Sequence, residues 1–176
     1  APGAHDANHA RARVIHGDRN PRASVEGVGG KRKAVKDVDV MTGRAHMPAS
    51  AKIPKLLCYE ELIAGQPGTL KWPDFDERTA SSLCYTSGTT GNPKGVLYTH
   101  RAIVLHTFGL SLADAFAISE RDTILQIVPM FHANGWGIPF AGVMNGSRMV
   151  FTGRHLQSPD IAALIQDERV TFTAGV

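Results

Sequence analysis

The chain has 176 residues, of which 43% are hydrophobic and 20% charged, and its formal net charge is +3. This length suffices for one hydrophobic core, while two cysteines, Cys58 and Cys84, are too few for a disulfide framework or a metal site and are expected to be small buried residues. No signal peptide and no apolar run of about 18 residues is visible, so we expect a cytoplasmic protein without a transmembrane segment.

The first 36 residues differ in composition from the rest. They contain no Leu, Phe, Tyr or Trp, and they are strongly basic. Such a segment cannot bury enough apolar area to offset its conformational entropy, so residues 1–37 are predicted to be a poorly ordered or atypical segment and residues 38–176 the globular domain. A basic arm can contact an anionic membrane peripherally, but a solvated tail is favoured. Because no aromatic residues are interleaved, no nucleic-acid partner is expected.

From Val38 onward the pattern becomes globular. Residues 48–54 are predicted to form a loop and 56–64 a short amphipathic turn, and Pro67 and Pro73 interrupt an exposed connection. Residues 80–85 and 95–98 are predicted to be strands, since each is a short apolar run beside a loop rich in glycine and hydroxyl residues.

That loop combines glycines, hydroxyls and one lysine, which is typical of phosphate binding. Glycines let backbone N–H groups close on an anion, hydroxyls add donors to phosphate or an oxygen ligand to Mg²⁺, and Lys94 adds a compact positive charge. It is not a P-loop, because no Gly-Lys-Ser/Thr sequence leads into a helix. The predicted phosphate-binding residues are Thr86, Ser87, Gly88, Thr89, Thr90, Gly91 and Lys94.

The remaining elements alternate between helix and strand. Thr99 is predicted to cap a helix running to about residue 117, followed by a strand over 122–128 and a helix from about 132 to 144. A strand over 148–151, a helix that starts at Ser158 and a strand over 170–174 complete the order. This alternation predicts an α/β fold with a mostly parallel sheet covered by helices on both faces. Ligands of such sheets bind beyond the carboxyl ends of the strands, where residues 129–136 are expected.

Three motifs carry a resemblance to a known family. Residues 83–95 resemble the signature of the adenylate-forming, AMP-binding superfamily, and residues 128–139 (Val-Pro-Met-Phe-His-Ala-Asn-Gly-Trp-Gly-Ile-Pro) are similar to the next motif of its fatty-acyl-CoA synthetase branch. Residues 171–176 are similar to the strand that leads into the acyl pocket. The resemblance covers roughly residues 38–176 and implies that the chain is an internal fragment, lying in the large N-terminal domain of a longer enzyme.

The resemblance implies a two-step reaction with ATP, Mg²⁺ and coenzyme A. A fatty acid of medium or long chain attacks the α-phosphate of ATP to give acyl-AMP, and coenzyme A then displaces AMP. The resemblance assigns catalysis to Lys94 and His132, the metal to Thr86, a nucleotide contact to Ala133, and the acyl pocket to Trp136 and Gly175. The fragment alone is expected to be inactive, because the later motifs of the family are absent.

Two alternatives stay open. One is activation of another carboxylic acid, such as a short thioether acid or an aryl acid. Amino-acid activation is disfavoured, since residues 131–139 contain no acidic side chain to hold an ammonium group. The other is a nucleotide-binding fragment without ligase activity. The oligomeric state does not follow from the sequence.

Overall fold

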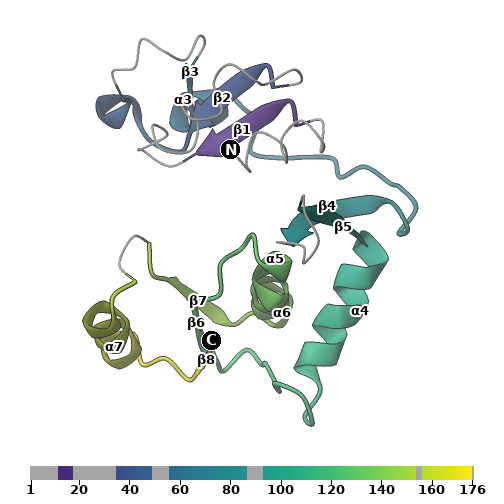
Figure 1. Ribbon diagram of the computed structural model, residues 1–176, viewed down its shortest axis with the longest axis vertical. Coiled ribbons are helices and arrows are strands. Elements are labelled where there is room, and N and C mark those ends of the chain that lie inside the picture. The colour runs from purple at the N-terminus through teal and green to yellow at the C-terminus, as the bar shows by residue number, and fades with distance from the viewer. Residues whose placement is uncertain (1–11, 18–34, 49–55, 87–92, 154–155, 176) are drawn as a thin grey trace. The chain divides into compact units, whose positions relative to one another are not determined.

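The computed structural model describes residues 12–17, 35–48, 56–86, 93–153 and 156–175 (Figure 1). The chain divides into two compact units, Ala1–Asp74 and Phe75–Val176. Within the described residues, no helix is long and apolar enough to cross a membrane.

The first unit contains a small parallel sheet. Strands β1 (Val14–Gly17), β2 (Asp37–Val40) and β3 (Leu56–Cys58) pair in the order β1-β2-β3. The short helices η2 (Arg44–His46) and α3 (Tyr59–Ala64) flank β3 in sequence. Val38, at the centre of the sheet, is buried against Ile15 and Leu56.

Strand β1 lies inside residues 1–37, which composition predicted to be a poorly ordered or atypical segment. Ile15 packs on Val38, and Nδ1 of His16 contacts Oδ2 of the fully buried Asp39 at 2.8 Å. His16 and Asp39 are partners in the β1–β2 register. The average composition of 36 residues cannot reveal one short strand whose stability comes from pairing with a distant strand. Most of the other residues of the segment lie outside the described ranges.

The second unit begins with an antiparallel hairpin. Strand β4 (Ala80–Thr86) pairs with β5 (Lys94–Thr99), and helix α4 (His100–Ser111) follows β5 without a gap. The simple alternation of strands and helices suggested that β5 would belong to the parallel sheet. It does not, because β5 pairs antiparallel with β4 in a separate two-stranded sheet. Helix α4 ends earlier than predicted, since the backbone at Leu112 is extended, with φ −65° and ψ 144°.

The parallel sheet of this unit has the order β7-β6-β8. It consists of β6 (Thr123–Gln126), β7 (Arg148–Phe151) and β8 (Phe172–Ala174), as Figure 1 shows. Along the chain, α5 (Ala133–Trp136) and α6 (Ile138–Asn145) connect β6 to β7, and α7 (Ser158–Asp167) connects β7 to β8. The parallel sheet and the helix starting at Ser158 confirm the predicted α/β class.

Helix α6 packs on β6 and β7, and α4 packs along α6. The core at this junction is formed by Ile118, Ile124, Ile138 and Ala141, all of them buried. Gly142 of α6 permits the close approach to the sheet: a β-carbon there would lie 2.3 Å from Sδ of Met149. This packing fixes α6, and with it the residues that precede α6, relative to the carboxyl end of β6.

A polar cluster closes the opposite, amino-terminal edge of this sheet. Asp122 accepts hydrogen bonds from the backbone N–H and hydroxyl of Ser119, at 2.8 and 2.9 Å, and from the hydroxyl of Thr171 at 2.8 Å. Burial acts to raise the pKa of Asp122, but these hydrogen bonds and the nearby Arg121 outweigh it and hold the pKa below its ordinary value of 3.8. The cluster joins the segments that enter β6 and β8.

Candidate active site

The end of the β4–β5 hairpin carries the first candidate residues. Thr86 and Lys94 are partners in the register, and the hydroxyl of Thr86 donates to the backbone carbonyl of Lys94 at 3.4 Å. Both residues are exposed, so the hydroxyl and the ammonium group lie at the mouth of the loop with access to a ligand. The predicted phosphate-binding residues between them, Ser87, Gly88, Thr89, Thr90 and Gly91, lie outside the described residues.

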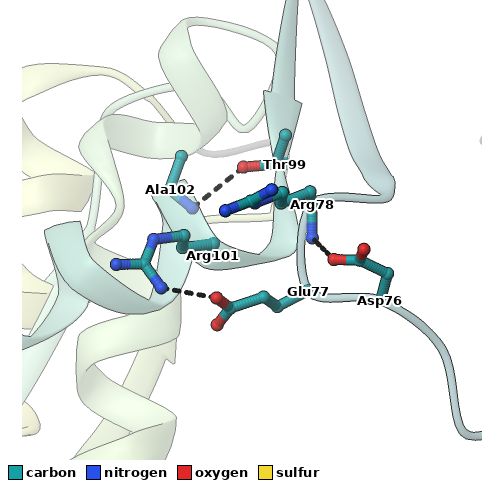
Figure 2. Close-up of polar contacts among 6 residues, drawn as sticks. All are labelled: Asp76, Glu77, Arg78, Thr99, Arg101 and Ala102. Carbon is teal, nitrogen blue, oxygen red and sulfur yellow. Dashed lines mark hydrogen bonds and ion pairs between the residues drawn. The ribbon is translucent and has the colours of Figure 1, made fainter.

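A network of polar contacts holds the start of α4 (Figure 2). The hydroxyl of Thr99 accepts from the backbone N–H of Ala102 at 3.1 Å, which confirms Thr99 as the N-cap. The guanidinium of Arg101 pairs with the carboxylate of Glu77, and its backbone N–H donates to the carbonyl of Glu77 at 2.8 Å. Arg101 is exposed, and its contacts with Glu77 tie the preceding segment to the start of the helix.

The segment that follows β6 forms a left-handed turn. The helix predicted to begin near His132 begins only at Ile138, because Ala133, Asn134, Gly135, Trp136 and Gly137 all have positive φ, between +46° and +72°. Label α5 therefore denotes a single left-handed turn and not the first turn of α6. Two glycines and one asparagine among five residues make this conformation accessible, since these residue types tolerate positive φ best.

His132 and Trp136 are brought together by this turn. Their ring centroids lie 6.5 Å apart, with an angle of 54° between the ring planes. The predicted helix from about 132 to 144 would have placed them one helical turn apart, whereas they are neighbours across a left-handed turn. His132 is exposed, whereas Trp136 is partly buried against the core.

Two polar side chains that sequence reasoning missed hold the turn. Nε2 of the buried Gln126, at the end of β6, donates to the carbonyls of Val128 at 2.6 Å and Gly135 at 3.4 Å. Asn134 donates from Nδ2 to Oγ of Ser82 at 2.9 Å. The sequence signals that could have indicated these contacts were a glutamine inside an apolar strand and an Asn-Gly pair inside an apolar motif.

An apolar cavity adjoins the turn. Its volume is about 460 Å³, and its walls come from β5, α4, the turn and α6. Trp136 and Ala133 line it, so the structure places both beside a space that can hold an apolar ligand. The wall also includes Asn134 of the turn, together with Tyr98, Ala102, Ile103, His106, Gly137 and Phe140.

Gly175 follows β8 at the carboxyl edge of the sheet. A β-carbon at Gly175 would lie 4.0 Å from Cγ2 of Ile127, which follows the neighbouring strand β6. Gly175 therefore lies beside the segment that leads to His132, although it is not among the cavity-lining residues.

The chemistry of the hairpin end, among the described residues, can match the phosphate groups of a nucleotide. No group of three or more His, Cys, Asp or Glu side chains that could hold a metal occurs among the described residues. Mg²⁺ bound with a nucleotide commonly takes most of its ligands from phosphate and water. The exposed hydroxyl of Thr86 fits one position of such an ion, and the ammonium group of Lys94 fits a phosphate oxygen.

Comparison with known proteins identifies the family of the chain. A sequence profile of the family described as AMP-binding enzyme matches residues 4–176. The match extends well upstream of residue 38, where the resemblance in the motifs was expected to begin.

Several curated proteins are similar to the chain. It is 47% identical to a 3-methylmercaptopropionyl-CoA ligase of Ruegeria pomeroyi, 44% to a medium-chain-fatty-acid–CoA ligase of Ectopseudomonas oleovorans and 41% to a long-chain-fatty-acid–CoA ligase of Thermus thermophilus. Each alignment covers 96% of this chain but only 29–31% of the relative. The chain thus spans less than a third of the length of these relatives.

Solved structures share the fold. A long-chain-fatty-acid-CoA ligase from Archaeoglobus fulgidus superposes with a TM-score of 0.77 at 23% identity, over 97% of this chain and 31% of that one. An anthranilate CoA ligase in complex with anthranoyl-AMP gives 0.76 at 20% identity, over 98% and 32%.

Proposed function

Since this chain belongs to the AMP-binding enzyme family, in its acyl-CoA ligase branch, we propose that it is part of a longer ligase that activates a fatty acid of medium or long chain. The acid reacts with ATP to give acyl-AMP and pyrophosphate, and coenzyme A then gives the acyl-CoA and AMP. We also propose a cytoplasmic location, where both cosubstrates are available.

One observation carries the proposal. A hairpin end that presents a hydroxyl and an ammonium group is tied to a turn that presents an imidazole, and an apolar cavity opens beside that turn. Phosphate, carboxylate and alkyl chain are the three parts of an acyl-adenylate. Each of these groups has a chemically matching partner here.

The first step brings two anions together, so its barrier is largely electrostatic. Lys94 would hold a phosphate oxygen by a charge-assisted hydrogen bond, and Thr86 would offer its hydroxyl to Mg²⁺ or phosphate. Mg²⁺, when bound, supplies further neutralisation of phosphate charge. The imidazole of His132, donating one N–H, would stabilise charge that develops between the carboxylate and the α-phosphate.

The cavity supports an apolar acyl group. Trp136 and Phe140 present aromatic surface, and the part of the wall described above contains no acidic or basic side chain other than the imidazole of His106. Burial of alkyl carbons there would contribute roughly 0.8 kcal/mol for each methylene. Amino acids, which carry an ammonium group, would lose its hydration without gaining an acidic partner.

The 47% sequence identity to the ligase of Ruegeria pomeroyi favours a second candidate substrate. That relative is named for a short thioether acid, so activation of such an acid is the alternative reading of the same site. Activation of an aryl acid is a further alternative.

The test is acyl-CoA synthesis by the full-length ligase, meaning the longer polypeptide that contains this sequence. Purified enzyme would be incubated with ATP, Mg²⁺, coenzyme A and one of octanoic, palmitic, 3-methylmercaptopropionic or benzoic acid. We expect the highest kcat/KM with octanoic or palmitic acid. A highest value with 3-methylmercaptopropionic or benzoic acid would replace the fatty acid by that class, and an absence of thioester with every acid would overturn the ligase itself.

A further inference from the structure

The strand that enters the phosphate loop presents one side to the turn that carries His132. Ser82, Cys84 and Thr86 alternate along β4, so their side chains lie on the same face of the strand. Asn134 contacts two of the three: Nδ2 donates to Oγ of Ser82 at 2.9 Å, and Oδ1 accepts from Sγ of Cys84 at 3.2 Å. The third, Thr86, lies about 7 Å further along the same face.

Asn134 suits this place for two physical reasons. Its φ of 56° and ψ of 37° are left-handed, a region that asparagine occupies more readily than most residues. Its amide offers both a donor and an acceptor, and both are used across 50 or more residues of sequence. On the other side of the turn, Gln126 holds the carbonyl of Gly135 from the core.

We propose that Asn134 is a positioning residue for acyl-adenylate formation, an inference that rests on the proposed function. The amide ties the turn to β4 and thereby fixes His132, two residues earlier in the chain, relative to Thr86 and Lys94 at the hairpin end. Asn134 also lines the apolar cavity, but both polar atoms of its amide are engaged by β4, so its amide acts through His132. A displacement of the imidazole by about 1 Å can cost roughly a hundredfold in rate, because the reacting geometry is lost.

The test uses the full-length ligase and Asn134→Gly. Glycine removes the amide yet keeps positive φ accessible, so the variant does not confuse loss of the hydrogen bonds with backbone strain. We expect kcat for acid-dependent ATP–pyrophosphate exchange to fall about tenfold or more, with the Kd for ATP within about twofold of wild type. Asn134→Asp should recover part of the loss, since its carboxylate still accepts from Cys84 and can accept from the hydroxyl of Ser82.

A double-mutant cycle with His132→Ala separates positioning from general support of the fold. If Asn134 acts through the imidazole, Asn134→Gly in the His132→Ala background should lower the rate by less than about twofold further. Ser82→Ala combined with Cys84→Ala removes the same two bonds without touching the turn, and it serves if Asn134→Gly does not fold. Ser81→Ala is the matched control, because Ser81 is an exposed neighbour on the other side of β4.

The two ideas fail differently. The positioning role would be overturned if the losses in rate of Asn134→Gly and His132→Ala multiply in the double mutant. It would also be overturned if Asn134→Gly leaves kcat unchanged while His132→Ala lowers it. Either result leaves the proposed function standing. Wild-type enzyme without acid-dependent exchange would overturn the proposed function and this inference with it. An unimpaired His132→Ala enzyme would likewise end the inference, since no imidazole would then need positioning.

Discussion

Gly137 is a residue whose identity the structure explains directly. Its φ is +72°, and a β-carbon there would lie 2.5 Å from Nδ1 of His106. Both backbone conformation and space therefore require glycine at the junction between the left-handed turn and α6. A larger residue would move either His106 or the turn that carries Trp136.

Gly137→Ala should lower the free energy of unfolding by roughly 1–3 kcal/mol, through strain at positive φ and overpacking. Urea unfolding of the 176-residue chain measures this. Gly146→Ala is the matched control, because its φ is +75° and nothing lies within 4 Å of its β-carbon. Equal losses in the two variants would show that the contact with His106 costs nothing.

Lys94 is the residue at which we test the proposed contact with the phosphates of ATP. In the full-length ligase, Lys94→Ala should slow acid-dependent ATP–pyrophosphate exchange about ten- to a hundredfold, since a hydrogen bond to a charged group contributes roughly 1.5–3 kcal/mol. Lys94→Arg, which keeps the charge, should lose less. Exchange kinetics unchanged in Lys94→Ala would remove Lys94 from the phosphate site.

At the scale of elements, Asp122 joins the starts of β6 and β8 through Ser119 and Thr171. A carboxyl whose pKa is lower in the folded chain stabilises it fully above the ordinary value of 3.8 and loses that contribution as the pH falls below it. Asp122→Asn should therefore reduce stability at neutral pH and reduce the further loss on acidification. Urea midpoints at pH values on either side of 3.8 test this, with the exposed Asp114→Asn as control. Parallel pH profiles of wild type and Asp122→Asn would contradict the role of Asp122.

Elements set by local signals were predicted from sequence. The Thr99 cap, the start of α7 at Ser158 and the strand at Arg148–Phe151 agree with their predictions, because capping residues, proline and apolar runs act over a few positions. The adjacency of Thr86 and Lys94 follows from the pairing of the two strands that were predicted on either side of the loop.

Features set by distant contacts were not predicted. The left-handed turn after His132 depends on Gln126 and on the contact of Asn134 with β4, and strand β1 depends on pairing with β2. An apolar motif read at helical spacing cannot distinguish a right-handed helix from such a turn. The pairing of Arg101 with Glu77 likewise required the path of the preceding segment.

At the scale of the whole molecule, the chain covers the hairpin, the turn and the cavity, yet less than a third of the length of its curated relatives. We therefore expect the 176-residue chain alone to form no acyl-CoA from ATP, a fatty acid and coenzyme A. Thioester detected by mass spectrometry above the level of a heat-treated sample would contradict this expectation.

The central claim is that this site joins a carboxylate to the α-phosphate of ATP. The most direct measurement is a single turnover of the full-length ligase with octanoic acid, Mg²⁺ and ATP labelled at the α-phosphate, without coenzyme A. The account predicts that labelled acyl-AMP accumulates on the enzyme and is converted to AMP and acyl-CoA when coenzyme A is added. Formation of labelled ADP in place of acyl-AMP would contradict it.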